Sequence, residues 1–128
     1  MKFRGNGKLL ITGEYVVLDG TKAFALPTKY GQDLKVNKTN EEFLSWKSFD
    51  EQNTKWLDVN FSFENNILIP DQRNAITERL SQILNTCLQL NKDCINSLQN
   101  KSIETYLDFN RNWGLGTSST LIYTLSEW

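Results

Sequence analysis

Histidine is absent from the 128 residues of this chain. Because histidine is the commonest general base and a frequent metal ligand, its absence excludes Ser-His-Asp hydrolysis, Cys-His proteolysis and histidine-based zinc sites. Cysteine is also scarce, with only Cys87 and Cys94. A continuous helix would separate these two residues by about 10 Å, which is too far for a disulfide. We therefore expect two reduced thiols that serve as packing groups.

A dominant sign of charge and a long apolar run are missing as well. Fourteen basic and fifteen acidic residues give a formal net charge of -1. This balance favours neither nucleic acid nor an anionic membrane as a partner, so an anionic ligand has to be held locally. No apolar run reaches the roughly 18 residues of a membrane helix, and no basic-then-apolar leader is present. We therefore expect a cytoplasmic protein. We also expect one domain over residues 1–128, since 39% hydrophobic residues suffice for a core.

Short apolar runs predict strands in the N-terminal part of the chain. The runs at 8–12 and 15–18 are separated by Gly13 and Glu14, and the second is followed by Asp19-Gly20, a typical hairpin-turn dipeptide. We expect a strand, a tight bend, a second strand and a turn. Pro27 should then end a strand or place it at a sheet edge.

Alternation of apolar and polar residues continues further along the chain. It predicts half-buried antiparallel strands at 32–38, 43–49 and 56–63, with turns at 50–54 and 64–66.

The periodicity changes after Pro70. Apolar residues at three- and four-residue spacing predict an amphipathic helix over 71–90, whereas 91–97 is ambiguous and is read as a continuation after a break. A strand is expected at 101–109, and a second helix begins where the apolar run at 121–125 starts. The expected fold is α+β, a mostly antiparallel sheet with helices packed on one face.

The segment 112–121, which reads NWGLGTSSTL, combines glycine, hydroxyl residues and a helix start. Gly114 and Gly116 permit close approach of an oxyanion to the backbone. The helix that follows would direct its unpaired amides and its positive dipole end at the loop. The segment therefore reads as a phosphate cradle. The alternative is an ordinary glycine turn with a Ser/Thr N-cap.

Two glycine-bearing motifs together resemble the GHMP kinases, the family of galactokinase, homoserine kinase, mevalonate kinase and phosphomevalonate kinase. The motifs are GKLLITGEYVVLDG at 7–20 and GLGTSSTL at 114–121. The resemblance implies the ribosomal protein S5 domain 2-like fold of the N-terminal domain, an ATP and Mg²⁺ requirement, and phosphoryl transfer to a small molecule such as mevalonate or phosphomevalonate. Walker A and protein-kinase glycine loops are not present.

The resemblance also implies a role for individual residues. Lys8 would act on the transferring phosphoryl group, and Glu14 and Tyr15 would face the acceptor, although several mevalonate kinases have histidine where Tyr15 stands. Ser119 would help to hold Mg²⁺. The nucleotide phosphates would be wrapped by Gly114, Leu115, Gly116, Thr117, Ser118 and Ser119. Taken singly, Lys8 also fits a solvated strand residue, Glu14 a turn residue and Tyr15 a core aromatic.

The four tryptophans, Trp46, Trp56, Trp113 and Trp128, are expected to pack in the core or at its edge. The alternative for Trp113, which is next to the glycine loop, is that its ring lies against a nucleotide.

The match resembles only the N-terminal part of such a kinase, because the family's third glycine motif and later carboxylate would follow Trp128. We expect this chain to be inactive alone and to form a homodimer through apolar surface that the missing part would cover. Two other functions remain open: a diphosphomevalonate decarboxylase-like enzyme, and a non-catalytic nucleotide-binding or interaction module.

Overall fold

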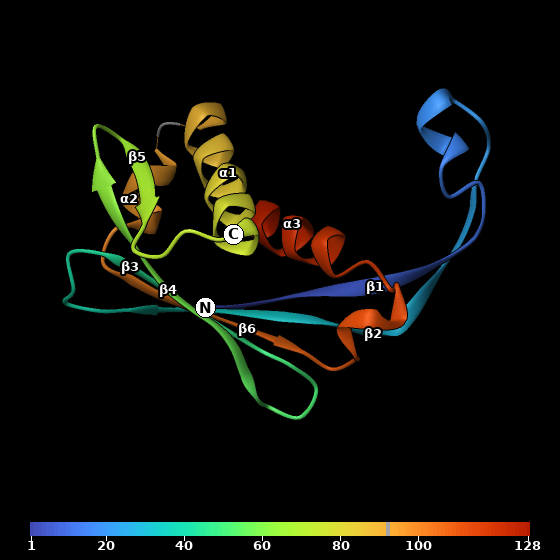
Figure 1. The fold of residues 1–128 in the computed structure, drawn as a ribbon, viewed down its shortest axis with the longest axis horizontal. Helices are drawn as coiled ribbons and strands as arrows, with labels where there is room; N and C mark the ends of the chain where they lie inside the picture. Colours follow the sequence, from blue (N-terminus) through green and yellow to red (C-terminus); the bar gives the residue numbers. More distant parts are fainter. Residues whose placement is uncertain (92) are drawn as a thin grey trace. The chain divides into compact units, whose positions relative to one another are not determined.

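The computed structural model describes residues 1–91 and 93–128, in two compact units. The first unit comprises residues 1, 35–49 and 55–104, and the second comprises 2–34, 50–54 and 105–128. The strands follow the order β1-β2-β6-β3-β4-β5 in a six-stranded sheet (Figure 1). Together with the helices of each unit, this sheet confirms the expected α+β class.

The first unit is built on two consecutive hairpins. β3 (Leu44–Phe49) pairs antiparallel with β4 (Lys55–Glu64), which pairs antiparallel with β5 (Ile67–Pro70). Alternate residues of β3 and β4 are buried, as the strand period requires. The strands predicted at 43–49 and 56–63 are confirmed. β5 was not predicted, because four residues are too few to establish a period.

The helix α1 (Ala75–Leu90) lies against β5 in the same unit. Asn74 begins the helix: its side chain accepts hydrogen bonds from the amides of Ile76 and Thr77, and the Thr77 hydroxyl accepts from the amide of Asn74 in return. This capping box places the start four residues later than the predicted 71. The buried face is Leu80, Leu84 and Leu88.

The short helix α2 (Cys94–Leu98) falls within the segment that was ambiguous from sequence, of which residue 92 lies outside the described residues. Leu98 is buried. Cys87 and Cys94 are free and partly buried, which confirms the expectation of two reduced thiols.

The second unit contains β1 (Lys2–Thr12) and the first part of β2 (Phe24–Lys38), joined by residues 13–23. The strand predicted at 15–18 is wrong: these residues belong to a turn and a 3₁₀ helix, η1 (Val16–Asp19). The amide of Val17 donates to the carbonyl of Gly13, and the amide of Gly20 donates to that of Val17. These local hydrogen bonds therefore use backbone N–H and C=O groups that a strand would pair with an adjacent strand.

β2 passes through Pro27, where the sequence predicted a strand end or an edge. The prediction of an end is wrong. Pro27 lies four residues before Gly31, whose carbonyl accepts the amide of Asp108 just beyond β6 (Lys101–Leu107). We infer that β2 at Pro27 extends beyond the end of β6. The N–H that proline lacks is therefore not needed for the pairing of β2 with β6.

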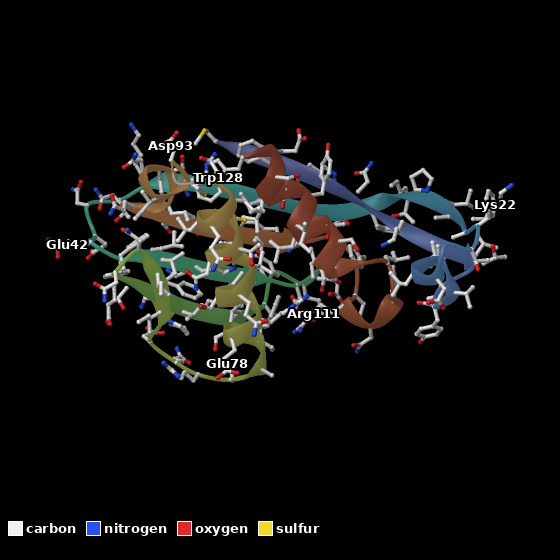
Figure 2. The ribbon with its side chains drawn as sticks, turned by 90° about the horizontal axis from the view of Figure 1, so that it is seen from above. Lys22, Glu42, Glu78, Asp93, Arg111 and Trp128 are labelled. Atoms are coloured by element: carbon white, nitrogen blue, oxygen red, sulfur yellow. The ribbon has the colours of Figure 1, made fainter. Side chains whose placement is uncertain are left out.

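The helix α3 (Thr117–Glu127) lies along β1 within the second unit (Figure 2). A Cβ on Gly5 would stand 2.8 Å from the carbonyl oxygen of Thr120, so helix and strand approach closely because this residue is glycine. The buried hydroxyl of Thr120 also donates to Gln32 Oε1 at 2.9 Å. These contacts fix the start of α3 against the sheet.

Among the described residues, no helix has both the length and the apolar character needed to cross a membrane.

Candidate phosphate-binding site

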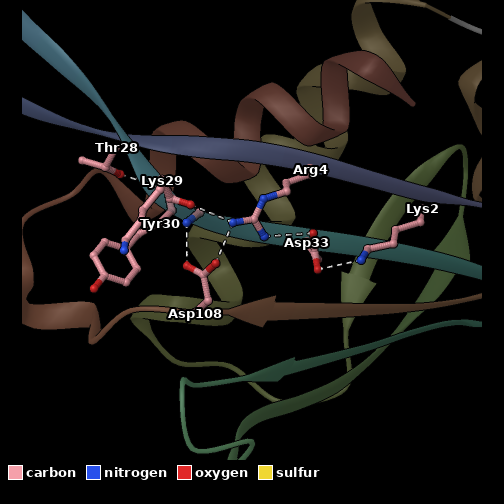
Figure 3. A network of polar contacts seen from close by, with 8 residues as sticks. Lys2, Arg4, Thr28, Lys29, Tyr30, Asp33 and Asp108 are labelled. Carbon is pink, nitrogen blue, oxygen red and sulfur yellow. Dashed lines mark hydrogen bonds and ion pairs between the residues drawn. The ribbon is translucent and has the colours of Figure 1, made fainter.

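The segment that leads into the glycine loop is fastened to β1 and β2 by Asp108 (Figure 3). One carboxylate oxygen accepts from the Arg4 guanidinium at 2.6 Å, and the other accepts from the amide of Gly31 at 2.6 Å. The hydrogen bond from Arg4 to Asp108 raises the pKa of the guanidinium, and the hydrogen bond from Arg4 to Asp33 raises it to a smaller extent. Sequence reasoning missed Asp108, for which the available signal was a single acid near the end of the strand predicted at 101–109.

The loop itself is held by its own backbone and by one apolar side chain. Asn110 caps the 3₁₀ turn η2 (Arg111–Trp113) by accepting the amide of Asn112 at 3.0 Å. Leu115 is buried with Leu107 and Phe109, and its carbonyl accepts the amide of Lys8 at 3.0 Å. The loop is therefore anchored on β1 at the residue whose side chain the sequence singled out.

Gly114 and Gly116 both adopt left-handed backbone conformations, with φ of 71° and 83°. L-residues with a Cβ rarely adopt this region, so the bend depends on glycine at both places. Gly116 is the N-cap of α3, and no side chain caps the helix. The predicted bend into a helix mouth is confirmed.

The first turn of α3 presents groups suited to an anion. In an α-helix the first amides have no intrahelical partner, and here the ladder begins with Thr120, whose amide donates to the carbonyl of Gly116 at 3.0 Å. Ser118 and Ser119 are exposed and Thr117 is partly exposed, so their hydroxyls are accessible. Backbone amides, hydroxyls and the positive end of the helix dipole converge on the same place.

Lys8 completes this group from the neighbouring strand. Its Nζ donates a hydrogen bond of 3.0 Å to the hydroxyl of Ser119. A Cβ placed on Gly116 would lie 3.1 Å from the same Nζ and 3.4 Å from Ser119 Oγ. The absence of that side chain therefore keeps open the space between a fixed cation and the helix mouth.

Glu14 and Tyr15 lie apart from this group. Lys8 and Thr12 are four residues apart on β1, about 13 Å at the rise of a strand, and Glu14 and Tyr15 follow in the turn beyond it. Tyr15 is 84% exposed, so the reading of a core aromatic is wrong. The structure brings Lys8 and Ser119 together and leaves these two residues at the tip of the hairpin.

The donor set fits an anion better than a bare metal ion. The described residues contain no group of three or more acidic, cysteine or histidine side chains that could hold a metal. Mg²⁺ prefers oxygen ligands, and Ser119 supplies one, but the Lys8 ammonium lies 3.0 Å from the same oxygen. Ser119 therefore suits Mg²⁺ when phosphate oxygens supply the negative charge between the two cations.

The fold and this arrangement define a class: an α+β domain like that of the GHMP kinases, with a glycine loop at a helix mouth and a lysine from the adjacent strand. Solved structures that share this fold include three kinases. The mevalonate kinase of Methanococcus jannaschii is 15% identical with a TM-score of 0.56, and the match covers 97% of this chain and 37% of that one. Another mevalonate kinase has the same identity and TM-score, with 97% and 38% covered.

The third is Streptococcus pneumoniae phosphomevalonate kinase in complex with phosphomevalonate and AMPPNP, which is 16% identical with a TM-score of 0.58. The match covers 99% of this chain and 35% of that one. This chain thus spans little more than a third of the length of these kinases. No sequence-family profile and no curated protein sequence matches it. The resemblance read from the two motifs is confirmed at the level of the fold.

Proposed function

We propose that residues 1–128 form the N-terminal ATP-binding domain, of the ribosomal protein S5 domain 2-like type, of a cytoplasmic GHMP-type kinase. The reaction is phosphoryl transfer from MgATP to an alcohol or phosphate acceptor resembling mevalonate or phosphomevalonate. The observation that carries the proposal is the bond between Lys8 and Ser119 at the uncapped start of α3. The kinase folds support it, and one of those proteins is complexed with phosphomevalonate and AMPPNP.

The residues of the chain have distinct tasks in this proposal. The backbone from Gly114 to Ser118 holds the nucleotide phosphates through amide hydrogens, as helix mouths do for anions generally. Lys8 provides a fixed positive charge where negative charge spreads over the transferring phosphoryl oxygens. Ser119 orients Lys8 and offers its oxygen to Mg²⁺. ATP with Mg²⁺, when bound, supplies the phosphoryl group.

Glu14 and Tyr15 remain the proposed acceptor contacts. Both are exposed at the hairpin tip, beyond the end of β1. An acceptor bound there has to be enclosed by other parts of a longer enzyme, because an open site leaves water in contact with the reacting atoms. We therefore expect this chain alone to bind nucleotide without measurable phosphoryl transfer.

The expected homodimer also remains a proposal. The connection between β1 and β2 exposes Tyr15 and Leu18, which are 84% and 89% exposed, and the first residue of β2, Phe24, is 56% exposed. A cluster of this kind is typical of a surface that another protein surface covers.

Calorimetric titration with MgATP tests the proposed site. Ser119→Ala should weaken binding of MgATP several-fold and weaken Mg²⁺-free ATP less. Ser126→Ala is the matched control, because this exposed serine lies near the other end of α3 and bonds the Tyr123 carbonyl. Equal affinity of all three proteins for MgATP would remove Ser119 from the site, and no binding by the wild-type chain would contradict the proposed function.

A further inference from the structure

Trp113 stands directly before the glycine loop and is 56% exposed. Trp46, in contrast, is 1% exposed and lies in the core, as predicted for the tryptophans in general. Trp113 therefore leaves a large part of a rigid aromatic side chain accessible beside the candidate site.

Hydrogen bonds fix the backbone at Trp113, and an aromatic neighbour contacts its ring. The amide of Trp113 donates to the carbonyl of Asn110 at 3.0 Å, and the Asn110 side chain donates to Glu51 Oε1 at 2.9 Å. The ring packs against Tyr30 in a T-shaped pair, with centroids 5.6 Å apart and an interplanar angle of 78°. An edge-to-face pair covers at most one face of the indole, and with Trp113 56% exposed, part of its surface is accessible to a second planar group.

The aromatic pair also borders the loop in space. Thr28, two residues before Tyr30, donates its hydroxyl hydrogen to the Tyr30 carbonyl. A Cβ on Gly7 would lie 2.9 Å from the carbonyl of Leu115 and 3.1 Å from the Thr28 hydroxyl. The stretch of β2 that carries Tyr30 therefore stands beside the backbone of the phosphate loop, and Trp113 is continuous with that loop.

We propose that Trp113, supported by Tyr30, is the stacking surface for the base of a nucleoside triphosphate whose phosphates lie in the loop. This inference rests on the proposed function, because the loop must hold the phosphates. A base is joined to its phosphates through one sugar. When the loop holds the phosphates, the base therefore lies close enough to stack on an aromatic ring next to the loop. Stacking on an aromatic ring recognises any base through its π-face.

The Lys29 ammonium, 5.7 Å from the Tyr30 ring centroid, adds positive charge to the same surface. This charge suits a ligand that carries both an aromatic ring and phosphates.

Comparing ATP with inorganic tripolyphosphate tests the inference, since tripolyphosphate has the phosphates without the base. In calorimetric titrations of the purified chain with Mg²⁺, Trp113→Ala should weaken ATP binding about 5- to 150-fold, the range for loss of one base-stacking ring. Tripolyphosphate binding should stay unchanged. Trp113→Phe should restore most of the ATP affinity, and Trp128→Phe, at the opposite end of α3 from the loop, should leave both affinities as they are.

The outcomes separate this inference from the proposed function. Unchanged ATP affinity in Trp113→Ala, with wild-type tripolyphosphate binding intact, would overturn the stacking role and leave the phosphate site standing. An equal loss of both ligands would also overturn it, since the indole would then act on the shape of the loop. If the wild-type chain binds neither ligand, the proposed function fails and the inference fails with it.

Discussion

The Lys8 ammonium donates a 3.0 Å hydrogen bond to the hydroxyl of Ser119, a residue 111 positions further along the chain. The bond joins β1 to the first turn of α3 and places a positive charge at the mouth of the helix. A cation held in this way by the protein needs little rearrangement to meet an anionic ligand, which is the condition for strong electrostatic stabilisation.

Removal of this charge should weaken phosphate binding. Lys8→Met is expected to lower the affinity for MgATP and for tripolyphosphate by about 10- to 100-fold, since hydrogen bonds to charged groups contribute roughly 1.5–3 kcal/mol. Lys22→Met, at an exposed lysine near the hairpin tip (Figure 2), is the control and should bind like the wild type. Equal affinities of both variants would place Lys8 outside the site.

Alanine at the two loop glycines should separate backbone strain from loss of space. Both residues have positive φ, so each substitution should destabilise the fold by about 1–2 kcal/mol in denaturant titrations. A Cβ on Gly114 meets no atom within 4 Å, whereas one on Gly116 lies 3.1 Å from Lys8 Nζ. Gly116→Ala should therefore reduce MgATP affinity more than Gly114→Ala. The reverse order would contradict a binding space between Lys8 and the helix mouth.

The buried bond between Thr120 and Gln32 should contribute to stability. Thr120→Val removes the donor to Gln32 Oε1, and a buried acceptor left without a partner costs about 1–3 kcal/mol. Thr124→Val is the matched control: both hydroxyls are buried and each bonds the carbonyl three residues earlier in α3, whereas the bond to Gln32 is made by Thr120. Chemical denaturation should show the larger loss for Thr120→Val, and equal losses would show that the bond to Gln32 adds nothing.

The two cysteines should react slowly with thiol reagents. Burial raises the pKa of Cys87 and, together with the charge of Cys87, the pKa of Cys94 above the ordinary value of 9.0. The reactive thiolate is therefore scarcer in the folded protein than in the unfolded chain at pH 8. Because the folded pKa is the higher one, these groups reduce stability as the pH rises from about 9 through the folded pKa. A disulfide-exchange reagent should label the native protein more slowly than the denatured protein; equal rates would contradict the shifts.

The exposed apolar hairpin connection should promote self-association. Light scattering after size exclusion is expected to give the wild-type chain about twice its 14.8 kDa mass at micromolar concentration. Leu18→Lys should shift the protein toward the monomer. Leu90→Lys, at a residue similarly exposed (83% against 89%) but on α1, should not. A monomeric wild-type mass would rule out the homodimer.

The sequence predicted the regular elements wherever a clear period extended over enough residues. Alternation located β3 and β4, and three- and four-residue spacing located α1. It failed for residues 15–18, whose β-branched and apolar side chains favour a strand but which turn through Gly13 and bond locally in η1. The β-propensity of these residues is overridden because their backbone groups form local hydrogen bonds and not bonds to an adjacent strand.

The candidate site divides in the same way. The glycine loop could be read from sequence, because positive φ and a helix start are local properties of residues 114–119. The anchoring of that loop by Asp108 and Arg4, and the half-exposed position of Trp113, could not. Those features depend on which strands lie side by side, and a residue's period along the chain carries no such information.

By itself, then, the sequence determined the type of the elements with a clear period, the glycine loop and the chemical inventory, from which histidine is missing. Tertiary structure alone decided that Lys8 meets Ser119 while Glu14 and Tyr15 remain at the hairpin tip. The physical reason is that local conformation follows from neighbouring residues, whereas the meeting of side chains 111 residues apart depends on how β1 and α3 pack together.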